Sequence, residues 1–87
     1  MDIEFDPAKN EANIAKHGLS LADAGLFPIS SAVVVADDRR EYGEDRQRAF
    51  ARVDGEGRCL VFTVTATAVR AISYRRAHEK EMSRYGL

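Results

Sequence analysis

The chain has a single cysteine, Cys59, so it cannot form an internal disulfide bond. It also lacks an apolar run long enough to span a bilayer, and its first ten residues lack the apolar stretch of a signal peptide. These absences favour a cytoplasmic protein with no membrane partner. Because Cys59 lies in the apolar run 59–62, we interpret it as a small core residue rather than a nucleophile.

Several motifs of known chemistry are absent. The two histidines, His17 and His78, are far apart, and Cys59 has no second cysteine and no histidine near it, so no metal-ligand spacing exists. A phosphate-binding loop, a dinucleotide fingerprint and a nucleophile elbow are also missing. The sequence therefore predicts no metal and no cofactor, and it excludes most classes of small-molecule enzyme.

The length and charge of the chain are informative. With 87 residues, 45% of them hydrophobic, it fits one domain over residues 1–87, and a partner or self-association would help so small a core. Residues 1–44 carry four bases and nine acids, a net charge of −5, whereas residues 45–87 carry nine bases and five acids, a net charge of +4. Such asymmetry favours a half that faces a polyanion, although these charges could also simply solvate the surface.

Local signals predict an α+β domain in which an N-terminal helical hairpin packs on an antiparallel β-meander that a short helix follows. Asp6 and Pro7 are typical of a helix start, and Gly18 of a helix stop. The two glycines in residues 54–57 predict a hairpin turn. The expected helices are 7–17, 20–27 and 77–85, and the expected strands are 2–5, 32–36, 46–53, 58–65 and 69–75.

The side-chain pattern predicts how these elements face the core. In the first helix, Ile14 and three alanines, Ala8, Ala12 and Ala15, would form an apolar face. Strand alternation groups Ser73 and Arg75 with Val69 and Ala71, and it places Arg70, Ile72, Tyr74 and Arg76 on the opposite face. It also groups Arg46, Arg48, Phe50 and Arg52, a combination that argues against a core face there. These arginines either suit phosphate or pair with Glu44 or Glu56.

The opening segment DPAKNEANIAKHGLS (6–20) resembles the DPxKxxxNxxKHGxS signature of the BrnT family, small ribonuclease toxins with a RelE/ParE-like fold. The segments YGEDR (42–46) and ISYRRA (72–77) are similar to later parts of that family, as is the spacing of Glu81 and Tyr85. The resemblance implies a RelE-like toxin of a type II toxin–antitoxin system, a metal-independent endoribonuclease that inhibits translation. It also implies a BrnA-like antitoxin that binds operator DNA and brings the toxin to it. The implied assembly is a homodimer of the toxin or a heterotetramer of toxin and antitoxin.

Carried over to this sequence, the resemblance assigns Arg46 and Arg75 to the scissile phosphate. His17 is the candidate for proton transfer, because its ordinary pKa suits catalysis near neutrality. The alternative is that His17 only ends its helix beside Gly18. Further RNA-binding candidates are Arg70, Arg76, Arg48 and Lys9, whereas Lys16 is expected at the surface or at a partner contact and Asn13 is expected to tie the helix to its neighbour.

One departure from the family pattern bears on activity. Thr65 stands where the family has the arginine of a TxR motif, and one transition-state contact can be worth about 3 kcal/mol. Arg70 could substitute for it. The alternative function is a weak or inactive RelE-like module that acts mainly by binding its antitoxin. Direct DNA binding is disfavoured, because the helix expected at 20–27 has no base.

Overall fold

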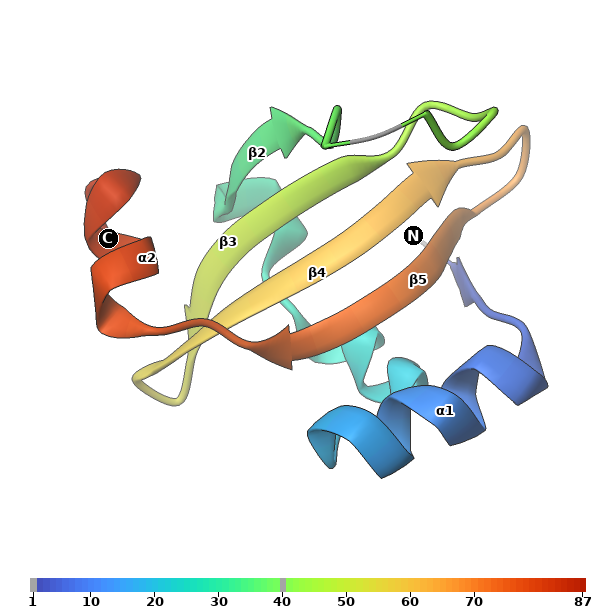
Figure 1. Cartoon of the computed structure of the whole chain (residues 1–87), viewed down its shortest axis with the longest axis horizontal. Coiled ribbons are helices and arrows are strands. Elements are labelled where there is room, and N and C mark those ends of the chain that lie inside the picture. Colours follow the sequence, from blue (N-terminus) through green and yellow to red (C-terminus); the bar gives the residue numbers. More distant parts are fainter. Residues whose placement is uncertain (1, 40) are drawn as a thin grey trace.

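A computed structural model describes residues 2–39 and 41–87. Its centre is a five-stranded sheet with the strand order β1-β5-β4-β3-β2 (Figure 1). The elements, in chain order, are β1 (Ile3–Glu4), α1 (Pro7–His17), the 3₁₀ helices η1 (Leu21–Leu26) and η2 (Ile29–Ser31), β2 (Val33–Ala36), β3 (Gln47–Val53), β4 (Glu56–Val64), β5 (Val69–Arg76) and α2 (Glu79–Arg84). None of the helices in the described part is long and apolar enough to cross a membrane.

The sheet is mixed rather than the purely antiparallel meander that was predicted. Strands β2 to β5 do form antiparallel neighbours in chain order. However, β1 pairs with β5 in parallel, Ile3 beside Val69 and Glu4 beside Arg70. The chain therefore enters the sheet at one edge and, after the helical segments, resumes at the opposite edge with β2. Such a non-local pairing leaves no trace in the local sequence pattern.

The first predicted helix has the expected bounds but not the expected buried face. The Asp6 carboxylate accepts a hydrogen bond from the Ala8 N–H at 2.9 Å, and Gly18 ends α1 with a φ of 70°. The three alanines are exposed, as is Ile14, whereas Asn13 is buried. Helix α1 thus attaches to the sheet through a polar side chain instead of an apolar stripe.

The second predicted helix is a 3₁₀ helix, so the helical hairpin pairs one α-helix with η1. The Ser20 hydroxyl accepts a hydrogen bond from the Ala22 N–H at 3.1 Å, and Pro28 closely follows the last turn. A segment this short, between a cap and a proline, closes with i→i+3 bonds such as that from the Phe27 N–H to the Ala24 carbonyl. It still buries Leu21 against the sheet.

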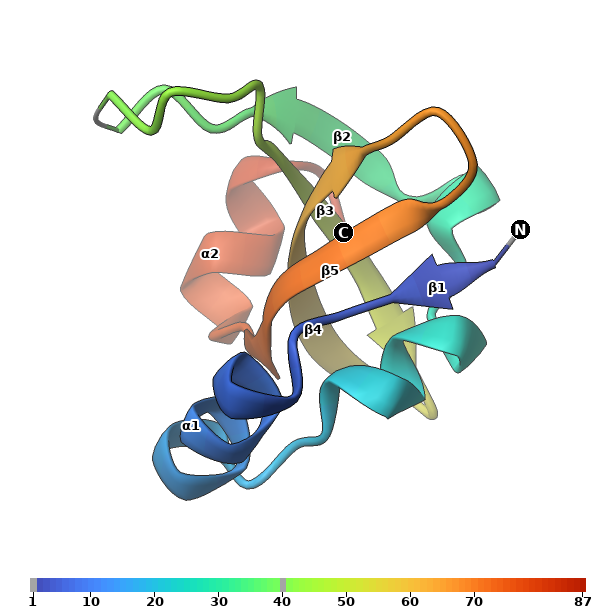
Figure 2. The ribbon, with the colours of Figure 1, turned by 90° about the vertical axis from the view of Figure 1, so that its right-hand side faces the viewer.

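The sheet carries apolar clusters on both faces, and the view in Figure 2 shows α2 and the 3₁₀ segments on different sides of it. The larger cluster lies under η1 and includes Leu60 and Tyr74. The smaller lies under α2, where the rings of Phe50 and Tyr85 stack with centroids 4.3 Å apart. The expectation that the face of Phe50 is not a core face was therefore wrong, because α2 packs on it at Phe50. Cys59 is buried there, and burial raises its pKa to about 11.

A β-bulge in β5 changes the predicted side-chain directions. Val61 lies opposite Ser73, yet the adjacent Phe62 lies opposite Ala71, so Ile72 is the extra residue. Val69 and Ala71 consequently join Tyr74 in the larger core, while Ser73 and Arg75 turn to the other face. Simple alternation had separated Arg70 from Arg75; the bulge brings them to one face. The hairpin at Asp54-Gly55 is as predicted, with a positive φ at both residues.

Candidate functional site

An open cleft of about 330 Å³ lies on the face of the sheet that Arg75 shares with Ser73. Its walls come from the last turn of α1, the segment between β2 and β3, and the bulged part of β5. Its lining consists of Lys16, His17, Asp37, Arg39, Tyr42, Arg46, Val61, Ile72, Ser73 and Arg75. The three residues expected to act in catalysis, His17, Arg46 and Arg75, therefore lie around one cleft although the sequence separates them widely.

Arg75 is the most constrained cation of the cleft. Its Nη1 and Nη2 atoms donate to the two carboxylate oxygens of Glu81, both at 2.9 Å, and Nη1 also donates to the Arg76 carbonyl at 3.1 Å. Both side chains of the pair are largely shielded, with 24% and 20% of their surfaces exposed. The Glu81 contact raises the pKa of Arg75, and the Arg75 contact lowers that of Glu81. The guanidinium is thus permanently charged and held in one orientation.

Arg46 enters the cleft just before β3. Its Nε donates to Glu44 at 3.0 Å, and its guanidinium lies 4.1 Å from the centre of the Tyr42 ring. The pairing with Glu44 was one of the two readings the sequence left open. It leaves the guanidinium at the wall of the cleft, with 18% of the side chain exposed.

A buried carboxylate supports the third arginine, Arg39. Asp37 is fully shielded and accepts from Arg39 at 2.6 and 2.8 Å, a contact that lowers the pKa of Asp37. Arg48 lies behind this pair, with its buried Nε 3.9 Å from Asp37 and without a hydrogen-bond partner. Arg48 does not line the cleft, so its predicted contact with RNA is not favoured by its position.

His17 is the last residue of α1 and lies beside Arg75 in the cleft lining. Burial and the positive charges of Lys16 and Arg75 lower its pKa below 6.5, so the imidazole is neutral at pH 7. Asn13 fixes the position of this helix end: its Nδ2 donates to the carbonyls of Leu19 and Tyr74, and its Oδ1 accepts from the Tyr74 N–H. The prediction that Asn13 ties the helix to its neighbour is confirmed.

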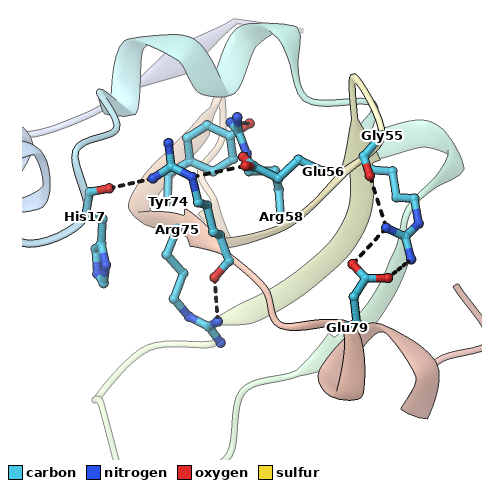
Figure 3. Close-up of polar contacts among 9 residues, drawn as sticks. His17, Gly55, Glu56, Arg58, Tyr74, Arg75 and Glu79 are labelled. Carbon is cyan, nitrogen blue, oxygen red and sulfur yellow. Dashed lines mark hydrogen bonds and ion pairs between the residues drawn. The ribbon is translucent and has the colours of Figure 1, made fainter.

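The remaining RNA-binding candidates lie outside the cleft. Lys9 and Arg70 line a neighbouring groove of about 370 Å³, in which Glu4 pairs with Arg70 at 3.1 Å. Ile72 contributes to both hollows, so the groove adjoins the cleft. Arg76 points to the opposite face of β5, where it bonds Glu56 and the His17 carbonyl, two acceptors drawn in Figure 3.

Thr65 lies in the turn that follows β4, away from the cleft lining. Its hydroxyl contacts both the carbonyl and the N–H of Ala68 at 3.0 Å and so closes the turn. Arg70 lies opposite Thr63 on β4 but points to the adjoining groove rather than to the cleft. Arg70 therefore does not take the place, within the cleft, of the family arginine that is missing at position 65.

Sequence reasoning missed several residues of the site. A charged segment whose composition is typical of a turn contains Asp37, Arg39 and Tyr42. Its sequence has no periodicity that would distinguish these residues from their neighbours. The pairing of Glu81 with Arg75 depends on how α2 folds back over the sheet. Within residues 2–39 and 41–87, no group of three or more His, Cys, Asp or Glu residues could hold a metal ion.

Two comparisons with known proteins identify the family. The profile of the family described as "Ribonuclease toxin, BrnT, of type II toxin-antitoxin system" matches residues 5–81. The chain belongs to the BrnT family. The crystal structure of the Brucella abortus ribonuclease toxin BrnT is 32% identical, covers 91% of this chain and 99% of that one, and superposes with a TM-score of 0.73. The sequence matches none of the curated proteins.

Membership in the BrnT family explains the architecture as well as the opening signature. The α+β fold, with an N-terminal helix, a mixed five-stranded sheet and a short C-terminal helix, is shared with the Brucella toxin over nearly its full length. A toxin of a type II system has a cognate antitoxin, so this BrnT chain has a protein partner.

Proposed function

We propose that this chain is an endoribonuclease that cleaves RNA without a metal and thereby inhibits translation. The observation that carries the proposal is the cleft itself, in which a neutral imidazole and two oriented guanidinium groups face one space. Guanidinium groups bind phosphate in a bidentate manner and stay charged at every working pH. A neutral histidine can accept a proton.

In the proposed reaction, the ribose 2′-hydroxyl next to the scissile phosphate gives its proton to His17 and attacks the phosphorus. The P–O5′ bond breaks as the new P–O2′ bond forms, which yields a 2′,3′-cyclic phosphate and a 5′-hydroxyl end. The departing 5′-oxygen takes a proton from water at the open side of the cleft, and the hydroxide that remains takes the proton from His17, which returns to its neutral form. No metal or redox partner enters this balance.

Arg46 and Arg75 stabilise the charge that builds on the phosphate oxygens in the transition state. Glu81 occupies the Nη edge of Arg75 in the resting protein, which leaves its Nε–H for the phosphate. Lys16 adds a positive charge beside His17. We assign Lys9 and Arg70 to a flanking part of the RNA, because their groove adjoins the cleft at Ile72.

The proposed partner is a BrnA-like antitoxin that binds operator DNA and brings the toxin to it in a heterotetramer. The cationic cleft would be neutralised most directly by acidic residues of that partner. Co-purification of the two proteins, followed by measurement of their molar mass, tests the assembly.

The decisive experiment follows purified parent protein on single-stranded RNA in the presence of EDTA, beside the Arg46→Ala, Arg75→Ala and His17→Gln variants. We expect cleavage by the parent that leaves cyclic phosphate ends, and losses of 10²-fold or more in each variant, a range of about 3 kcal/mol. Expression in a bacterial host should arrest growth and protein synthesis only for the parent. Cleavage by the parent that all three variants retain would contradict the site.

A second candidate function rests on Thr65. Because the family arginine is absent there and the cleft arginines are each paired with a carboxylate, the chain could act mainly through antitoxin binding and autoregulation. Assays of the parent protein separate the two functions. If the parent binds its antitoxin tightly but cleaves no RNA, it is a binding module.

A further inference from the structure

A second groove continues beyond the cleft on the other side of Arg75. It has a volume of about 550 Å³, and its lining consists of Arg75, His78, Lys80, Glu81 and Arg84. Arg75 also lines the cleft, so the Arg75–Glu81 ion pair forms the border between the two hollows. A ligand that leaves the cleft over Arg75 enters a surface built by α2.

The cations of this groove differ from those of the sheet. Within the described residues, each arginine of the sheet has a carboxylate within 4.0 Å. Lys80 and Arg84 are exposed and form no such pair in the part of the chain that the structure describes. They are four residues apart on α2, so they project from the same side of the helix. Their charge is available to an anion without the loss of an internal ion pair.

The spacing of charge favours a long polyanion over a single phosphate. Lys16 on one side of Arg75 and the Lys80–Arg84 pair on the other are separated by a neutralised ion pair, and Lys9 extends the series into the groove beside α1. A phosphodiester chain presents one charge per nucleotide, which matches separate cations placed along a path. A lone anion would need several donors at one point.

We propose that the groove of Lys80 and Arg84 is a binding subsite for the phosphodiester backbone of single-stranded RNA next to the scissile nucleotide. This inference rests on the proposed ribonuclease function and extends it. Single-stranded RNA passes over the Arg75–Glu81 ion pair, and α2 forms one wall of the groove that it then enters. The subsite contributes affinity without base recognition, because its cations face the backbone charge.

Binding is measured with a 20-nucleotide 2′-O-methyl RNA, which lacks the attacking hydroxyl and cannot be cut. The Lys80→Gln/Arg84→Gln variant should bind it about tenfold more weakly, with the salt dependence of log K reduced by about 1.4 for two lost phosphate contacts. The charge-matched control is Ala22→Glu/Ser30→Glu, which alters exposed positions on the 3₁₀ segments. It should stay within about twofold of the parent. The loss in the α2 variant should shrink when the RNA is shortened to four nucleotides.

The outcomes separate this inference from the proposed function. If the parent cuts ordinary RNA but the α2 variant binds the 2′-O-methyl RNA as the control does, the subsite is overturned and the ribonuclease stands. If the parent cuts nothing yet the α2 variant alone loses affinity, the subsite stands as an RNA contact. Unchanged RNA affinity with weakened antitoxin binding would overturn the subsite and assign the groove to the protein partner.

Discussion

Glu81 of α2 accepts hydrogen bonds from both Nη atoms of Arg75 on β5, each at 2.9 Å. His78, the residue that caps α2, also helps to lower the pKa of this carboxylate. The position of the helix and the orientation of the cleft arginine are therefore coupled through one side chain. Any change that moves α2 should reach the cleft.

The Glu81→Gln variant tests this coupling. An amide cannot receive both Nη atoms as a charged pair, so Arg75 loses its fixed orientation while the cleft gains a net positive charge. We expect a lower kcat, by about tenfold, together with a lower KM for RNA, because binding and orientation change in opposite ways. Steady-state kinetics on one RNA substrate give both values.

Glu79→Gln is the matched control, since Glu79 lies on the same helix and makes a similar two-point contact with Arg52 at 2.7 and 3.0 Å. That pair is exposed and outside the cleft lining. Its loss should leave kcat within about twofold and change stability little, because solvent screens the pair. Equal effects of the two variants would contradict a special role for Glu81.

Acid should unfold the protein through its paired carboxylates. Arginine contacts lower the pKa values of Asp37 and Glu81 in the folded state. A group whose pKa is lowered by folding stabilises the protein fully above its unfolded pKa, near 3.8 for Asp37 and 4.5 for Glu81. That contribution disappears as the pH falls through the folded pKa. The free energy of unfolding, measured by urea titration, should decline slightly below pH 6.5, where the unfolded chain protonates His17 before the folded protein does, and fall steeply below about 4; a flat profile to pH 3 would contradict this.

Asn13 should be the residue of α1 that stability depends on most. Asn13→Ala removes three hydrogen bonds and leaves the buried N–H and carbonyl of Tyr74 without these partners, so we expect a loss of about 2–4 kcal/mol. Glu11→Ala, at an exposed position of the same helix, should change stability by less than about 0.5 kcal/mol. Urea denaturation of both variants measures the difference. A mild effect of Asn13→Ala would mean that α1 is held elsewhere.

Rules that act over a few residues predicted much of this fold. The cap at Asp6 and the stop at Gly18 gave the bounds of α1, and the glycine-rich turn gave the β3–β4 hairpin. The bulge at Ile72 was not predictable, because an extra residue in a strand leaves the apolar and polar pattern ambiguous. The exposed alanines of α1 misled for a related reason: alanine favours a helix but does not say which side is buried.

The candidate site was predictable only as a set of residue types. The family signature pointed to Arg46, Arg75 and His17, and the structure brings these three around one cleft. The pairing of Arg46 with Glu44 was one of the readings that the sequence left open, but the other carboxylate partners could not be foreseen. Glu44 is near Arg46 in sequence, but Glu81 reaches Arg75 only because α2 folds back over the sheet, and Asp37 depends on a segment without regular structure.

Gly57 should control the docking of α2. A Cβ atom there would lie 2.7 Å from Met82 Cγ and 2.8 Å from the Ala77 carbonyl oxygen, so Gly57→Ala forces the start of α2 to move. We expect a loss of about 1–3 kcal/mol and reduced RNA cleavage. Gly25→Ala is the control, because no atom lies within 4 Å of its added Cβ. Thermal denaturation of both variants, with cleavage rates at a temperature where both are folded, tests the link; normal cleavage by Gly57→Ala would break it.

The pH dependence of cleavage should report His17. Burial, Lys16 and Arg75 lower its pKa below 6.5, and only the neutral imidazole accepts a proton. We therefore expect kcat/KM to be constant near neutrality and to fall about tenfold per pH unit below the lowered pKa. Lys16→Gln removes one of the charges that lower this pKa, so its inflection should move upward. His17→Gln should lose 10²-fold or more of the rate and the acid limb with it. If kcat/KM of His17→Gln falls at low pH in the same way as that of the parent, another group titrates there and acts as the base.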